Sequence, residues 1–166
     1  MKKKQKNNYI LPLAAVLCVL SLAVMVFTLT RQEVQTEMGE FTPPPFDAAA
    51  VVGSPAVPDG LGWQELDAKV YKVGICGKFI PHGNTADVWL TNPISNTVWL
   101  KVRVLDENGS TLGETGIIKP GEYVQSVTLD TVPKTGQPIV LKIMAYQPDT
   151  YYSEGAVSLN TTISEE

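Results

Sequence analysis

The sequence predicts an all-β domain of two packed antiparallel sheets, preceded by an apolar N-terminal helix and a proline-rich linker. From Trp63 onward, short runs of β-branched and aromatic residues are separated by Gly, Pro, Asn and Asp about every eight to twelve residues. Within these runs apolar and polar residues alternate, as they do in a strand with one buried face. No window in this part has apolar residues at helical spacing.

The N-terminal segment has the pattern of a membrane anchor. Residues 10–30 carry no charged side chain, and as an α-helix they would be roughly 31 Å long, enough to span a bilayer core. Four lysines precede this run, whereas Arg31 follows it beside Glu33. By the positive-inside rule, we expect a cytoplasmic basic tail at 1–9 and a single-pass helix at 10–30 in the cell membrane, with the rest of the chain extracellular.

The alternative for the apolar run is a cleaved signal peptide. The run is longer than a typical signal-peptide core, and no cleavage motif of small residues follows it. An uncleaved signal anchor, with the lipid bilayer as its partner, therefore fits the sequence better.

Residues 31–62 differ from the segments on either side of them. They contain TPPPF and GSPAVPDG and show neither a helical nor a strand period, so we expect a flexible linker that reaches about 30 Å as a coil. The extracellular domain would then be 63–166. All 17 acidic residues follow residue 30, against 9 of the 13 basic ones, so residues 31–166 carry a net charge of −8. Nucleic acid is therefore not an expected partner.

The expected strands are separated by turns with recognisable chemistry. Asn108-Gly109 can close a tight hairpin, and Pro120-Gly121 suits a type II turn. Asn92-Pro93 ends a strand, because proline cannot donate to a ladder. Seven strands in about 104 residues match the size of an immunoglobulin-like sandwich. The strands are expected at 69–75, 85–91, 97–105, 110–115, 122–129, 138–147 and 155–163.

The stretches TADVWLTNPISN, VRVLDENGSTLGETGIIKPGEYV and LKIMAYQPDT resemble small Ig-like or fibronectin-like β-sandwich ectodomains on single-pass membrane anchors of Gram-positive bacteria. The resemblance covers about residues 63–163. Its motifs are turn and core signals, so it implies a fold and a place on the bacterial cell surface and no catalytic site. The paired cysteines and the tryptophan pattern of antibody domains are missing.

A Val-Trp-Leu triplet occurs at 88–90 and again at 98–100. Alternation places Trp89 and Trp99 on the more polar face of their strands. If the two strands form a direct hairpin, Trp89 lies opposite Trp99. If the chain instead crosses between sheets, as the sandwich rhythm favours, the tryptophans lie on different outer faces. The sequence leaves both arrangements open.

A candidate binding face follows from the crossing arrangement, in which 97–105 neighbours 138–147. Arginine and aromatic residues are enriched at interface centres, so such a face could bind another envelope or surface protein. Two alternatives remain: a cell-wall glycan as the ligand, or a solvated sheet face without a partner. Tyr151 and Tyr152 would either extend the contact or cap the sandwich end. The expected outward residues are Trp99, Lys101, Arg103, Lys142, Met144 and Tyr146.

Signals for catalysis or metal binding are weak. Cys18 would lie in the bilayer, so Cys76 is an odd external thiol, and a buried core position suits it best. Cys76 and His82 lack the third side chain that would orient the histidine for nucleophilic catalysis by the cysteine. The acidic stretch at 106–108 could coordinate calcium, but turns favour these residues anyway. We therefore expect a non-catalytic protein without a metal or cofactor.

Overall fold

The computed structural model describes residues 18, 20–22, 25 and 41–165. Its strands belong to one compact unit, Pro43–Glu166. The predicted tail at 1–9, most of the predicted anchor at 10–30 and the linker up to residue 40 lie outside the described residues. The five described residues between 18 and 25 are helical. No helix in the described part of the chain has the length and apolar character that a bilayer crossing needs.

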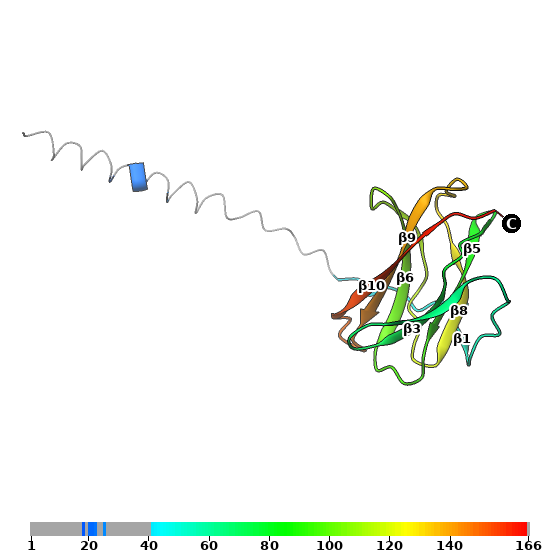
Figure 1. Ribbon diagram of the computed structural model, residues 1–166. Helices are drawn as coiled ribbons and strands as arrows, with labels where there is room; N and C mark the ends of the chain where they lie inside the picture. Colours follow the sequence, from blue (N-terminus) through cyan, green and yellow to red (C-terminus); the bar gives the residue numbers. More distant parts are fainter. Residues whose placement is uncertain (1–17, 19, 23–24, 26–40, 166) are drawn as a thin grey trace, which may run out of the picture. The chain divides into compact units, whose positions relative to one another are not determined.

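The compact unit is all-β, with two antiparallel sheets that pack as a sandwich (Figure 1). The six-stranded sheet has the order β1-β8-β5-β3-β2, with β4 beside β5, and the four-stranded sheet has the order β10-β9-β6-β7. The strands are β1 Val51–Val52, β2 Trp63–Asp67, β3 Lys72–Cys76, β4 Pro81–His82, β5 Thr85–Asn92, β6 Trp99–Asp106, β7 Thr111–Glu114, β8 Glu122–Thr128, β9 Pro138–Tyr146 and β10 Ser153–Thr162.

All seven expected strands are present, and the described residues contain three more: β1, β2 and β4. β1 and β4 have two residues each, too few to show alternation. β2 is a polar edge strand with every second residue exposed. The strand expected at 69–75 begins only at Lys72, because Ala68 and Tyr71 close a turn with a 2.9 Å backbone hydrogen bond.

The expected linker does not extend to residue 62. Residues 43–62 belong to the compact unit, and β1 pairs with the edge of β8. Upstream of β1, the Asp47 amide donates to the Ile117 carbonyl and the Ile117 amide donates to the Pro45 carbonyl, both at 2.9 Å. The Asp47 carboxylate also accepts a 2.8 Å bond from the amide of Gly116. Proline is tolerated beside a sheet edge because it need not donate there. A proline-rich composition therefore did not preclude packing.

Residues 53–62 join two strands that are far apart in the sheet. β1 lies at one edge of the six-stranded sheet and β2 at the other. We call this segment the proline-rich connection. Its C-terminal end is tied to the residues after β3, where the amides of Gly77 and Lys78 donate to the carbonyls of Gly62 and Leu61 at 2.9 and 3.0 Å.

The Val-Trp-Leu triplets lie in different sheets, because β5 belongs to the six-stranded sheet and β6 to the four-stranded one. The crossing arrangement is therefore confirmed, and the direct hairpin is wrong. The crossing loop is held by the buried Asn92 side chain, whose Nδ2 donates to the carbonyls of Val98 and Ile118 at 2.9 and 3.2 Å. Asn96 Nδ2 donates to Asn92 Oδ1 at 2.7 Å, which completes the network.

The core lies between the sheets and follows the expected alternation. Val88 and Leu90 of β5 are fully buried, as are alternate residues of β6 and β9. Burial of each such aliphatic side chain contributes about 1.5–3 kcal/mol. The buried residues of β6 and β9 are Leu100, Val102, Val104, Leu141, Ile143 and Ala145.

Candidate interaction face

The six expected site residues meet on one face of the four-stranded sheet. β6 and β9 are antiparallel neighbours, and their register places the outward residues directly opposite one another. Directly opposed side chains on one face of a sheet are within contact range. We call this surface the basic-aromatic face. Its cross-strand pairs are Trp99 with Tyr146, Lys101 with Met144, and Arg103 with Lys142.

Glu114 of β7 binds two of the three basic side chains. Its Oε1 lies 2.6 Å from Lys101 Nζ, and its Oε2 lies 2.7 Å from Arg103 Nη2. Burial alone would raise the pKa of Glu114, but the hydrogen bonds from Lys101 and Arg103 outweigh it and lower that pKa. Lys101 is only 4% exposed and its ammonium is held by Glu114, so the expected outward position of Lys101 is not available to a partner.

The hairpin between β6 and β7 brings Glu114 beside Arg103, but its turn differs from the expected one. The amide of Gly109 donates to the Asp106 carbonyl at 3.0 Å, so Glu107 and Asn108 are the central turn residues, and Gly109 has a positive φ whereas Asn108 does not. The two-residue Asn108-Gly109 turn is therefore wrong, and a bulge between the pairs Leu105–Thr111 and Val104–Gly113 sets the register that pairs Arg103 with Glu114. Lys142 is half-buried and makes no ion pair among the described residues, so it supplies a positive charge of the face that no carboxylate neutralises.

An aromatic cluster covers one end of the face. The ring of Trp99 packs edge-on against Phe46 at 4.9 Å and against Tyr151 at 5.3 Å between ring centroids. Lys119 places its Nζ 4.6 Å from the centre of the Phe46 ring, in cation-π range. Phe46 was missed because it lay in the expected linker. Tyr151 joins the cluster, whereas Tyr152 is 72% exposed.

Along β9 the face continues from Tyr146, which lies opposite Trp99, to Met144 and Lys142, all three half-buried. Tyr146 Oη lies 3.6 Å from Met144 Sδ, and burial raises the pKa of the Tyr146 hydroxyl. The neighbouring strand β10 presents small side chains opposite Met144 and Lys142, namely Ala156 and Ser158. The side chains that β10 places beside Met144 and Lys142 are therefore small.

The remaining candidate groups have structural roles. Cys76 is buried, and desolvation together with the charge of Asp87 raises its thiol pKa to about 11, so it is not a thiolate at neutral pH. Asp106 Oδ1 accepts backbone hydrogen bonds from Asn108 and Ser110 at 2.9 and 2.7 Å, which is the turn role. Among the residues that the structure describes, no group of three or more His, Cys, Asp or Glu side chains is placed to hold a metal ion.

Comparison with protein-family models gives no match, and comparison with curated proteins gives none either.

Proposed function

We propose that this protein is a membrane-anchored, extracellular, non-catalytic interaction module of the bacterial cell surface. Its β-sandwich would be Ig-like, and its basic-aromatic face would bind an acidic patch on another envelope or surface protein. The observation that carries the proposal is the β6–β9 register, which gathers Trp99, Arg103, Lys142, Met144 and Tyr146 on one face. Tryptophan, tyrosine, methionine and arginine are enriched at interface centres, and Lys142 adds positive charge that suits an acidic partner.

The anchor part of the proposal rests on the sequence. Residues 10–30 have the length and apolar character of a membrane-spanning helix, and the lysines before them favour a cytoplasmic N-terminus. The chain would thus be a single-pass protein with its C-terminal domain outside the cell. Surface protease on intact cells should remove the domain and leave a fragment near the N-terminus, and complete protection with a permeable outer layer would contradict this topology.

The binding test should target Lys142. Arg103 and Lys101 share Glu114, so changing either would also disturb the sheet. Lys142→Glu reverses the unneutralised charge of the face. It should leave the fold intact, because Lys142 is only half-buried and its side chain makes no ion pair among the described residues. Lys134→Glu makes the same charge change in an exposed loop between β8 and β9 and is the matched control.

The full chain should be crosslinked on cells as wild type, Lys142→Glu and Lys134→Glu. A genuine partner is crosslinked by wild type and by the control, and is lost or strongly reduced with Lys142→Glu. The loss should be greatest at low salt, since screening weakens charge attraction as ionic strength rises. Equal crosslinking of that partner by all three proteins would place the interaction surface elsewhere.

A cell-wall glycan is the second candidate ligand. The aromatic cluster Phe46–Trp99–Tyr151 favours it, because amphipathic rings suit ligands with both apolar and polar surfaces. Binding of the full chain to purified wall polymers, lost with Tyr151→Ala and unaffected by Lys142→Glu, would support this alternative over the protein partner.

A further inference from the structure

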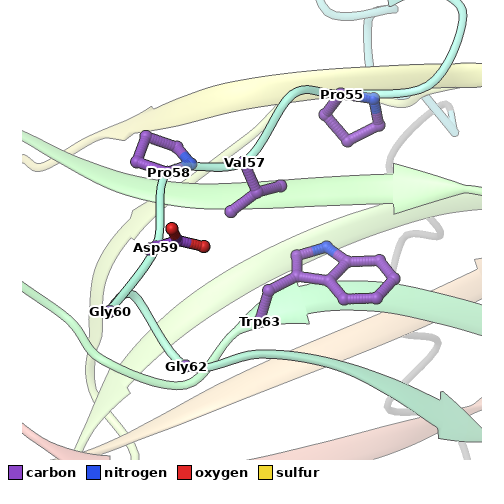
Figure 2. A pocket seen from close by; sticks show the side chains of 7 residues that line it. All are labelled: Pro55, Val57, Pro58, Asp59, Gly60, Gly62 and Trp63. Atoms are coloured by element: carbon purple, nitrogen blue, oxygen red, sulfur yellow. The ribbon is translucent and has the colours of Figure 1, made fainter.

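A hollow lies at the edge of the six-stranded sheet, away from the basic-aromatic face. The proline-rich connection and the first residue of β2 border this open hollow of about 660 Å³, a volume in the usual range of about 300–1,000 Å³ for small-ligand sites. Three apolar side chains, Pro55, Val57 and Pro58, form one part of its lining, and Asp59 and Trp63 form the rest together with glycine backbone. Figure 2 shows Val57 and Asp59 directed into the space beside the Trp63 indole.

The Trp63 ring is positioned by the sheet. It lies against Gly74 of β3, where a Cβ atom would be only 2.7 Å from Trp63 Cζ2, so a larger residue at 74 would displace the indole. The Trp63 side chain nevertheless remains partly open, and the residue is 42% exposed. A large aromatic ring that is supported on one side and open on the other is a preformed contact surface.

The connection that carries Asp59 is also fixed near the hollow. Gly60 and Gly62 have φ values of +86° and +65°, a conformation that other residues rarely adopt. The backbone hydrogen bonds from Gly77 and Lys78 hold Leu61 and Gly62 in place. The carboxylate and the indole are therefore presented by anchored backbone.

The lining favours an occupant that brings its own positive charge and hydrogen-bond donors. Asp59 is the charged residue of the lining, and it forms no ion pair or side-chain hydrogen bond in the described part of the chain. Pro55 and Pro58 have no backbone N–H to donate. Residues 43–166 contain 14 acidic and 8 basic side chains, which adds a negative background. A saccharide is a weaker match, because its neutral hydroxyl groups form no ion pair with the Asp59 carboxylate.

We propose that this hollow binds a lysine or arginine side chain of a partner protein. The aliphatic stem would pack on the proline and valine side chains. The cationic head would lie between the Trp63 ring and the Asp59 carboxylate, where cation-π attraction and ion pairing act together. This site lies on a different sheet from the basic-aromatic face and does not depend on the function proposed for that face.

A titration with minimal probes tests the chemistry. Nα-acetyl-lysine methylamide and its neutral counterpart Nα-acetyl-norleucine methylamide would be added to the full chain in neutral detergent, with the indole N–H resonance of Trp63 followed by NMR. The lysine probe should shift this resonance in a saturable manner and bind about fivefold more tightly than norleucine, the range for a partly exposed cation-π contact and ion pair.

Two variants locate the site. Asp59→Asn keeps the shape and removes the charge, so it should abolish most of the difference between the two probes. Glu65→Gln removes an exposed charge from the same edge strand and should leave both affinities unchanged. Lys142→Glu should bind the lysine probe like wild type, which separates this site from the basic-aromatic face.

The proposal is overturned if the lysine probe does not shift Trp63, if norleucine binds as tightly as lysine, or if Asp59→Asn binds like wild type. A stronger Trp63 shift with a chitin oligosaccharide than with lysine would assign the hollow to glycan instead.

Discussion

Trp89 and Trp99 occupy the same position in identical Val-Trp-Leu triplets, yet their environments differ. Trp89 lies on β5 at a bulge, has a φ of 48° and is 9% exposed. Its ring stacks on Tyr123 at 6.1 Å, and its Nε1 is buried without a hydrogen-bond partner in the described structure. Trp99 lies on β6 directly opposite Tyr146, is half-buried and has two edge-on aromatic neighbours.

The difference shows that a local motif does not define a side chain's role. Neither residue belongs to the core cluster. Trp89, at the bulge in β5, is nevertheless buried, whereas Trp99 on the regular strand β6 is half-buried. A bulge re-aims a side chain and increases local twist. The backbone, together with residues distant in sequence, therefore separates a structural tryptophan from a candidate contact.

The largest expected effect is at Trp89. Trp89→Ala should lower the free energy of unfolding by about 3–5 kcal/mol, the range for buried large aromatics. Trp89→Phe should cost much less, because it keeps a ring and removes an unsatisfied N–H whose burial costs about 1–3 kcal/mol. Denaturant unfolding of both variants measures this, and equal losses would show that the indole nitrogen carries no penalty.

The crossing that separates the two tryptophans should be the next most sensitive feature. Asn92→Ala removes the donor to the Val98 and Ile118 carbonyls and the acceptor for Asn96. Each buried polar group left without a partner costs about 1–3 kcal/mol, so we expect a loss of about 3 kcal/mol in denaturant unfolding. Asn160→Ala on the exposed side of β10 is the control. A loss no larger than the control's would mean that the loop holds its shape without the network.

Trp99→Ala should destabilise less than Trp89→Ala. The residue is half-buried, and each aromatic pair contributes about 0.5–1.5 kcal/mol, so the expected loss is about 2 kcal/mol. The same variant should lose binding if the aromatic cluster contributes to the basic-aromatic face. A stability loss as large as that of Trp89→Ala would mean that Trp99, like Trp89, is a packed structural residue.

The smallest expected effect is on the stability of the fold at acidic pH, through Glu114 beside the basic-aromatic face. The pKa of Glu114 is lower in the folded state than in the unfolded state. The ionised carboxylate therefore adds to the free energy of unfolding above the unfolded-state pKa, and this stabilisation is lost as pH falls through the folded-state pKa. Because the side chain is 35% exposed, we expect at most about 1 kcal/mol. Unfolding measured from neutral to acidic pH should show a flatter dependence for Glu114→Gln, whereas Glu107→Gln, in an exposed turn, should follow wild type.

The site residues were predictable to different degrees. The outward residues of β6 and β9 follow from strand alternation, which depends only on a period of two. The Asn-Gly hairpin indicated a strand carrying Glu114 beside β6, but the pairing of Glu114 with Arg103 depends on a bulge. Phe46 was not, because its contact with Trp99 spans more than fifty positions of sequence and nothing local in TPPPF indicates it.

The sequence by itself determined the all-β class, the core alternation and the positions of the turns, since each depends on residues a few positions apart. It also placed the six expected residues on common faces of their strands. Only the tertiary structure decided that β5 and β6 belong to different sheets, that residues 43–62 pack onto the domain, and that Lys101 is buried against Glu114. These outcomes depend on strand order, a bulge and long-range contacts, whose free energies are set by partners that no local pattern identifies.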